Sequence, residues 1–301
     1  MTTPAASIIV RSFDEGWALR DTLASLNRQS FSAWELIVID SGSSDGSQDL
    51  IRAARPAHFV QITPAEYIPG RVLNQGMRLA RAETGIFLNA DATPQGPDWL
   101  RPLVEALAQP RVAACFGRQI PRPDCRAVFA HDYDRCFGPH RESARWDHFF
   151  SLVSSGIRRD VWQRRNFRED LRFAEDDEYT RWCRSQGYAI RFVPESVAMH
   201  SHNYTPAQAY RRAFGDARSQ ATAEPATPRK PTFVKSVLLG CLRDGRKDLA
   251  YCLRTRRLSE FPHALRIRWN QRLGRFAGFR QGWTDSRASP LPSASPDLRL
   301  P

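Results

Sequence analysis

Carboxylates follow apolar runs in the first part of this chain, where they could bind a cation, a sugar or a base. Asp14 and Glu15 come after SIIV at residues 7–10, and Asp40 comes directly after LIVI at residues 36–39. In an open α/β sheet, ligands bind beyond the carboxyl ends of the strands. An aspartate there can accept a hydrogen bond from a nucleotide base or a ribose hydroxyl, but it is also a common turn former or helix cap. The residues alone leave both roles open.

A second set of candidate ligands lies further along the chain. Asn89 and Asp91 end the segment FLNAD at residues 87–91, and oxygen ligands there suit Mg²⁺ or Mn²⁺ bridging the phosphates of a nucleotide. His200 and His202 are two apart in an extended segment, so both side chains point the same way and could bind a metal. The alternatives are an ordinary turn aspartate and a pair of surface or packing histidines.

Four consecutive carboxylates, Glu175–Glu178, open a predicted helix. One of them, directed into a cleft, could act as a general base. Acidic residues in a first helical turn also complement the helix dipole, which is their more common role. The pattern therefore offers a candidate base and a structural alternative.

The elements that position these residues alternate between strand and helix. Besides the two apolar runs, strands are predicted near 58–62, 86–88, 112–117 and 189–193, and helices near 17–26, 47–55, 71–82, 97–108 and 175–187. This alternation predicts an α/β fold with a Rossmann-like, doubly wound and mainly parallel sheet and helices on both faces. Residues 119–150, rich in Pro, His, Arg and aromatic residues, are predicted to be a long functional loop region.

Four segments of the chain, taken in order, resemble the family 2 glycosyltransferases with a GT-A fold. They are SIIVRSFDEG, VIDSGSSDG, FLNADATP and FAEDDEY…GYAIRFVPESVAMHSHNY. The resemblance runs from Ser7 to Tyr204 and extends to bacterial members that build surface polysaccharides, including rhamnosyltransferase-like proteins. It implies a metal-assisted, inverting transfer of a hexosyl or deoxyhexosyl group, with Mg²⁺ or Mn²⁺ as cofactor. The donor would be a UDP-, dTDP- or GDP-sugar, and the acceptor a glycan or a lipid-linked molecule.

The same resemblance assigns roles to individual residues. Asp176 matches the catalytic base, and Asp91 matches the metal-binding last position of the DxD motif. His200 matches a histidine that helps to hold the metal or the diphosphate. The donor-binding positions are Arg11, Phe13, Asp14, Glu15, Asp40, Asn89 and Asp91. Asn89 stands where the family usually has the first carboxylate of DxD, which lowers the expected metal affinity.

Two other function classes remain as alternatives. One is a catalytically inactive GT-A-like protein that only binds sugars or partners, suggested by Asn89 and opposed by the retained Asp91 and Asp176. The other is a nucleic-acid-binding protein recruited through the arginine-rich C-terminal part. No RRM, KH or helix-turn-helix pattern supports it, so no nucleic-acid partner is expected.

Charge divides the chain into two parts. Residues 1–205 hold 25 arginines and 25 acidic residues, so the whole net charge of +12 lies in residues 206–301. The expected organisation is a GT-A catalytic domain at 1–205 (a donor-binding half at about 1–118 and an acceptor-side half at about 119–205), a basic helical extension at 206–283 and a disordered tail at 284–301.

The extension contains an apolar stripe at helical spacing. Its positions are Phe261, Leu265, Trp269, Leu273, Phe276 and Phe279, and arginines occupy mostly other faces. Such a basic amphipathic helix is typical of an anionic membrane surface, although its apolar face could instead pack on the catalytic domain or on a second subunit. Six cysteines without a CxxC pair, the lack of a signal peptide and the lack of a membrane-spanning stretch predict a cytoplasmic protein. The membrane alternative for the basic helix would place it peripherally on the inner face of the plasma membrane.

Overall fold

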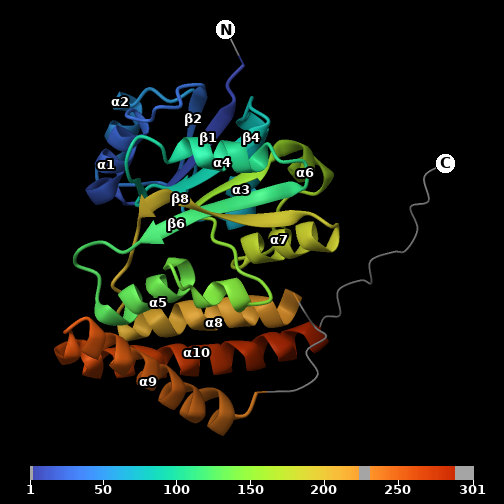
Figure 1. Ribbon diagram of the computed structural model, residues 1–301. Helices are drawn as coiled ribbons and strands as arrows, with labels where there is room; N and C mark the ends of the chain where they lie inside the picture. Colours follow the sequence, from blue (N-terminus) through green and yellow to red (C-terminus); the bar gives the residue numbers. More distant parts are fainter. Residues whose placement is uncertain (1–2, 224–230, 289–301) are drawn as a thin grey trace. The chain divides into compact units, whose positions relative to one another are not determined.

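The computed structural model describes residues 3–223 and 231–288, and the chain divides into two compact units, Met1–Asn203 and Tyr204–Pro301 (Figure 1). The first unit is built on a sheet whose strands lie in the order β3-β2-β1-β4-β7-β6-β8-β5. Their bounds are β1 Ala6–Ser12, β2 Trp34–Asp40, β3 His58–Gln61, β4 Thr84–Asn89, β5 Thr93–Pro94, β6 Val112–Ile120, β7 Ser154–Arg158 and β8 Ala189–Met199.

The sheet is mostly parallel. Strand β1 pairs in parallel with β2 and β4, β2 with β3, and β6 with β8. Strand β7 runs antiparallel between β4 and β6, and the short β5 runs antiparallel to β8. The helices of this unit are α1 Gly16–Leu26, α2 Ser47–Ala53, α3 Pro69–Leu79, α4 Leu100–Leu107, α5 Ala127–Phe137, α6 Arg159–Arg164 and α7 Glu175–Ser185, with a 3-10 turn at Glu142–Arg145.

Helices cover both faces of the sheet because β1 is buried on both sides. Ile8 packs in one apolar cluster with Leu19 of α1 and with residues of α4, and the next residue, Ile9, packs in a second cluster with Met77 of α3 and Tyr179 of α7. Successive side chains of a strand point to opposite faces, so a continuous apolar run implies a core on each face. The predicted α/β class, with its mainly parallel sheet, is confirmed.

The predicted loop at residues 119–150 is wrong in part. Strand β6 continues to Ile120, and helix α5 occupies Ala127–Phe137. The start of this helix is buried on all sides, from Ala127 to His131, so it shows no apolar period that a sequence reading could detect. The remainder of the segment connects these elements to β7.

The second unit is helical. It contains α8 Pro206–Ala223, a short π-helical stretch at Val234–Leu238, α9 Leu239–Arg254, a 3-10 turn at Leu258–Glu260 and α10 Phe261–Ala288. Helices α8 and α10 lie side by side (Figure 1). A Cβ atom added at Gly278 of α10 would lie 2.1 Å from the carbonyl oxygen of Phe214, so only glycine permits this approach. Among the described helices, none is long and apolar enough to cross a membrane.

One prediction for α10 stays open and one needs correction. The apolar stripe is only partly covered, since Leu265 and Trp269 are 43% and 41% exposed while the glycines and Ile267 are buried, and its role in packing or at a membrane stays a prediction. Helix α10 also continues through residues 284–288, which were expected to be disordered. There the Asp285 carboxylate accepts hydrogen bonds from Arg218 of α8 and from Gln281, and these bonds stabilise the last turns. The rest of the predicted tail, residues 289–301, lies outside the described residues.

Candidate active site

A pocket of about 330 Å³ opens beyond the carboxyl ends of β1, β2 and β4. It is lined by Arg11, Ser12, Phe13, Glu15, Ser41, Pro64, Tyr67 and Asn89. Four of the residues predicted to bind the donor, Arg11, Phe13, Glu15 and Asn89, therefore share one pocket. The sequence reading missed the other four, because a serine, a proline or a single tyrosine after a strand end carries no recognisable motif.

Arg11 links the floor of this pocket to α7. It stands opposite Asn89 in the parallel β1–β4 pairing, and its Nη2 donates to the Asn89 side-chain oxygen at 2.8 Å. Its Nη1 lies 4.0 Å from a carboxylate oxygen of the buried Glu175, the first residue of α7. The guanidinium of Arg11 thus links the ends of β1 and β4 to the start of α7. It would also contact a negatively charged ligand bound in the pocket.

Asp14 and Asp40 do not line the pocket. Asp14 adopts a left-handed conformation (φ 50°), and its carboxylate accepts the backbone N–H of Ser44 at 2.7 Å. Asp40 is fully buried, and its carboxylate accepts the backbone N–H groups of Gly42 and Ser43. Both side chains hold the turn after β2, which is the structural alternative left open by the sequence. Their part in donor binding stays a prediction.

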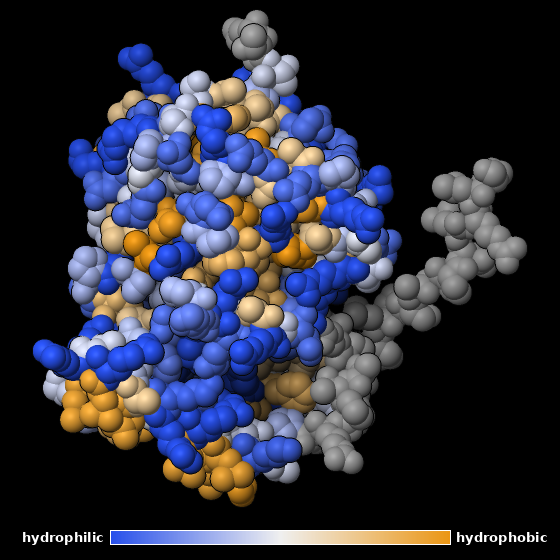
Figure 2. All heavy atoms as spheres, viewed as in Figure 1, coloured by the Kyte–Doolittle hydropathy of each residue, from blue (hydrophilic) through white to orange (hydrophobic). Residues whose placement is uncertain are grey.

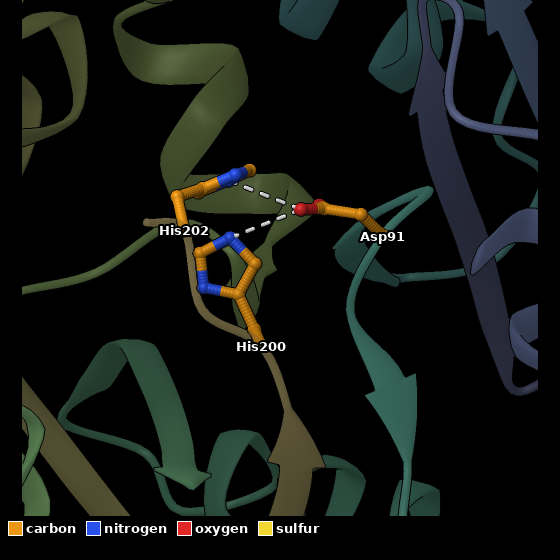
Figure 3. Close-up of side chains that lie close together, drawn as sticks. All are labelled: Asp91, His200 and His202. Atoms are coloured by element: carbon orange, nitrogen blue, oxygen red, sulfur yellow. Dashed lines mark ion pairs between the residues drawn. The ribbon is translucent and has the colours of Figure 1, made fainter. Parts of the chain in front are cut away.

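Asp91 lies beside two histidines, as Figure 3 shows. Its Oδ2 is 3.5 Å from Nε2 of His200 and 3.1 Å from Nε2 of His202. One potential ligand atom from each residue can be chosen so that all three lie within 4.8 Å of one another. We call these three residues the Asp–His–His cluster. The family resemblance assigned Asp91 and His200 to a metal site, and the spacing of two made His202 a possible ligand as well.

Strand pairing creates this cluster from segments far apart in the sequence. Asp91 lies between β4 and β5, and Thr93 of β5 pairs with Met199, the residue before His200. The backbone N–H of His200 also donates to the carbonyl of Ile120 at the end of β6. The two histidines are therefore carried to Asp91 by the antiparallel β5–β8 pair.

The ring of His200 is held in a defined orientation. Its Nδ1 lies 3.0 Å from the side-chain oxygen of Gln119 and 2.9 Å from the hydroxyl of Tyr133, and the amide of Gln119 donates in turn to Ser151. A carbonyl oxygen can only accept, so Nδ1 carries the ring proton. The lone pair of Nε2 then points toward Asp91, as in histidines that bind metals through one nitrogen and are oriented through the other.

The electrostatics of the cluster favour an ionised Asp91. Burial acts to raise its pKa, but the imidazoles of His202 and His200 and the guanidinium of Arg122 outweigh burial and lower the pKa of this carboxyl. Both carboxylate oxygens of Asp91 are buried, and Oδ2 faces the Nε2 atoms of His202 and His200. A buried carboxylate of this kind is costly unless a cation offsets its charge.

Glu15 connects the pocket to the cluster. Burial, followed by the charge of Asp91, raises the pKa of Glu15 to about 8, and Arg11 opposes the shift. Burial is the main cause of the shift and the negative charge of Asp91 is the second, and a cation bound near both carboxylates would oppose it.

Arg122 is a further candidate that the sequence reading missed. Its Nη2 donates to the backbone carbonyl of Asp91 at 2.6 Å, and its guanidinium lies 4.6 Å from the ring centre of Trp17. Trp17 itself is 60% exposed, next to the pocket residues that precede α1. The pair fixes the backbone at Asp91 and presents an aromatic ring to solvent near the cluster.

Asp176 occupies the first turn of α7. Burial, with the neighbouring charge of Asp177, raises the pKa of Asp176, while the backbone N–H of Asp177 and the charge of Arg11 oppose the shift. One oxygen of Asp176 accepts that backbone N–H at 2.8 Å. A half-buried carboxylate with a raised pKa is a stronger proton acceptor than an exposed one.

His148 supports the same turn from the segment before β7. Its Nε2 lies 2.8 Å from the hydroxyl of Thr180 and 3.4 Å from a carboxylate oxygen of Asp177. The Thr180 hydroxyl donates to the carbonyl of Asp176 at 2.7 Å, so Nε2 of His148 donates to Thr180. Desolvation lowers the pKa of His148 to about 4, which keeps the ring neutral at ordinary pH.

Known proteins share both the sequence pattern and the fold. The family model described as Glycosyl transferase family 2 matches residues 7–165. The O-antigen chain rhamnosyltransferases RfbN of Salmonella typhimurium and WbaN of Salmonella anatum are 27% and 26% identical to this chain, over 69% and 70% of its length and 70% of their own.

Solved glycosyltransferases have the same architecture. The mannosyltransferase PcManGT from Pyrobaculum calidifontis, solved with GDP-Man and Mn²⁺, matches 95% of this chain and 88% of its own with a TM-score of 0.64 and 20% identity. The TarS 1-349 structure from S. aureus with UDP matches 92% and 91% with a TM-score of 0.51 and 15% identity. These likenesses show the GT-A fold. Since the family model spans more than half of the sequence, the chain belongs to glycosyl transferase family 2.

Proposed function

We propose that this chain transfers a sugar from a nucleotide-sugar donor to a hydroxyl group of a glycan or lipid-linked acceptor, with inversion at the anomeric carbon. The observation that carries the proposal is the continuity of the site. The pocket at the strand ends includes Asn89, two residues before Asp91 of the Asp–His–His cluster, and Arg11 of the same pocket lies 4.0 Å from Glu175 at the acidic start of α7. Donor, cation and base would therefore act at neighbouring positions.

The pocket at the strand ends is the part of the site that best suits a nucleotide-sugar donor. Phe13 and Tyr67 offer aromatic surface for a base, and Arg11 offers a positive charge for a diphosphate. The ligands named for PcManGT and TarS, GDP-Man and UDP, support a nucleoside diphosphate sugar. The names of RfbN and WbaN support a deoxyhexose such as rhamnose as the transferred group. The donor nucleotide would be UDP, dTDP or GDP.

Asp91, His200 and His202 would hold a divalent cation. The residues fit this role because the carboxylate is buried and ionised, and because the Nε2 atoms of His200 and His202 lie 3.5 and 3.1 Å from it. Two imidazoles and one carboxylate suit Mn²⁺ better than Mg²⁺, which prefers oxygen ligands. When bound, the cation would supply positive charge to stabilise the diphosphate leaving group.

Asp176 would act as the general base. In a single displacement, the acceptor hydroxyl loses its proton to Asp176 while its oxygen bonds to the anomeric carbon and the bond from that carbon to the diphosphate breaks. A single displacement of this kind inverts the configuration. The backbone N–H of Asp177 occupies one oxygen of Asp176, and the other oxygen would receive the proton.

The experiment that tests this proposal measures thermal stabilisation of the protein by UDP, dTDP, GDP and their sugars, with and without Mn²⁺ or Mg²⁺. A ligand that binds only the folded state raises the unfolding temperature by mass action. We expect a shift with one nucleotide that is larger with Mn²⁺ than with Mg²⁺. His202→Asn should weaken the metal-dependent part, whereas His140→Asn, at an exposed histidine outside the cluster, should leave it unchanged.

Two outcomes would contradict the proposal. If no nucleotide stabilises the protein in the presence of acceptor glycans, the chain is an inactive relative that binds other partners. If stabilisation is full without a metal and unaffected by His202→Asn, the cation has no place at the Asp–His–His cluster.

A further inference from the structure

Apolar residues gather on the exposed side of α9 and of the segment that precedes it. Figure 2 shows apolar surface in the region where Figure 1 places this helix. The exposed residues are Val234, Leu238, Leu239, Leu242 and Leu253, of which Leu242 is 65% and Leu253 58% exposed. We call this set the α9 face. Clustered exposed leucines are unusual on a protein surface and mark a place where something else binds.

Two ion pairs fix α9 with these leucines outward. Arg268 of α10 donates to both carboxylate oxygens of Asp248, and both side chains are buried. One turn earlier, Arg272 pairs with Asp244. The acidic residues of α9 are these two aspartates, so all of its negative charge is paired on the side that faces α10. Rotating the leucines inward would break a buried ion pair, which is strongly unfavourable.

Basic residues share the exposed side of the helix. Lys235, Leu239, Leu242 and Arg246 follow one another at spacings of four, three and four, which places them on one helical surface. Lys235 and Arg246 are exposed, and so is Arg243 next to Leu242. Lysine and arginine therefore lie beside the leucines of the α9 face, while the two aspartates of the helix pair with arginines of α10 instead.

We propose that the α9 face docks on the surface of an anionic lipid bilayer. Leucines of such a face enter the boundary between headgroups and acyl chains, while lysine and arginine beside them contact lipid phosphates. The charge pattern selects this partner over a second copy of the same face, because two copies would bring basic residues together across the contact. The sequence pattern pointed to α10 as a membrane-facing helix, but the structure gives α9 the larger exposed apolar face. The inference does not depend on the proposed sugar transfer.

The test is sedimentation of the full chain with vesicles of phosphatidylcholine alone or mixed with phosphatidylglycerol. We expect binding to the mixed vesicles and little binding to phosphatidylcholine alone, and added salt should weaken it because exposed charges are screened. Leu239→Gln with Leu242→Gln should lower the vesicle partition coefficient by at least about tenfold, since apolar burial contributes to binding. Leu239→Met with Leu242→Met keeps the surface apolar and should bind normally.

A second pair of variants separates the charge contribution. Lys235→Gln with Arg246→Gln should weaken binding to anionic vesicles, whereas Arg20→Gln with Arg28→Gln, which removes the same charge from exposed positions of the first unit, should not. All these positions are exposed, so each variant should keep the unfolding temperature of the parent. The proposal would be overturned if the parent did not bind vesicles, or if Leu239→Gln with Leu242→Gln left vesicle binding unchanged. It would also be overturned if the parent were a dimer that Leu239→Gln with Leu242→Gln converted to a monomer while vesicle binding stayed the same.

Discussion

Asp176 and Asp177 are adjacent carboxylates with different surroundings. Asp177 accepts a hydrogen bond from Arg181 at 2.7 Å, so the guanidinium offsets its charge. The Asp176 carboxylate accepts the backbone N–H of Asp177, and burial raises its pKa. The difference suits Asp176 to exchange a proton and Asp177 to hold the helical turn in place.

We predict that Asp176→Asn lowers the turnover number by about 10²- to 10⁴-fold, the range that general base catalysis contributes. Asparagine is nearly the same size but cannot accept the proton, so the dissociation constant of the donor should change by less than about twofold. Steady-state transfer kinetics and nucleotide binding, measured on the same preparation, check both statements.

The matched control is Asp177→Asn, which removes the same charge from the same turn. It should reduce turnover far less than Asp176→Asn. Equal losses in the two variants would mean that the turn acts through its total charge, and the assignment of the base to Asp176 would then be wrong.

At the scale of elements, α7 depends on a contact from a distant segment. His148 lies 32 residues before Thr180 and donates to its hydroxyl, and the Nδ1 atom of the ring is buried without a hydrogen-bond acceptor. Protonation at Nδ1 would create a buried positive charge and a new N–H donor for which the described residues offer no hydrogen-bond acceptor. Desolvation therefore lowers the pKa of His148 to about 4, although Asp177 acts in the opposite direction and Arg184 and Arg181 reinforce the shift.

This shift predicts a pH dependence of stability. A histidine in the unfolded chain has a pKa near 6.5. Between about pH 6.5 and 4, His148 is therefore protonated in the unfolded chain and neutral in the folded protein. The free energy of unfolding should fall as the pH is lowered through this window. His148→Gln keeps a donor for Thr180 but does not titrate, so its urea midpoint should fall less steeply from pH 6.5 to 4.5 than that of the parent. Parallel curves for the two proteins would show that His148 is not the responsible group.

The sequence predicted the elements that have a strong local pattern. Buried runs such as SIIV and LIVI identify β1 and β2, because a parallel strand covered on both faces is apolar throughout. Helix α5 was missed because its first turn is buried on every side and shows no period. On α10 the apolar stripe did not reveal the closest helix packing, which uses glycines that a hydrophobicity pattern does not register.

The candidate site was predictable to the extent that motifs mark it. Strand-end residues such as Arg11 and Asp91 were named because their positions follow from the sheet. His148 and Arg122 were not, since each acts through a partner that only the folded chain brings near. Tyr67 lines the pocket from a segment in which no motif marks it. His202 was visible as a neighbour of His200, but its distance of 3.1 Å to Asp91 depends on the pairing of β5 with β8.

For the whole molecule, chemistry and charge are carried by different units. The pocket, the Asp–His–His cluster and Asp176 all belong to residues 11–202, whose unit is close to neutral. The net positive charge and the α9 face belong to the second unit. A change that disturbs packing in the second unit should therefore affect the stability of the protein separately from donor binding.

The contact between α8 and α10 offers such a change. Gly278→Leu places a Cβ atom 2.1 Å from the carbonyl oxygen of Phe214, so the two backbones have to separate. Leucine is a better helix former than glycine by about 1 kcal/mol, but overpacking against a backbone atom outweighs this gain.

We predict that Gly278→Leu loses about 1–3 kcal/mol in the free energy of unfolding by urea, whereas Ala277→Leu, at the adjacent and partly exposed position, should cost less. Nucleotide affinity of folded Gly278→Leu, measured below the onset of unfolding, should stay within about twofold of the parent, because every residue assigned to the donor lies in the first unit. A parallel loss of affinity and stability would instead show that the second unit contributes to the donor site.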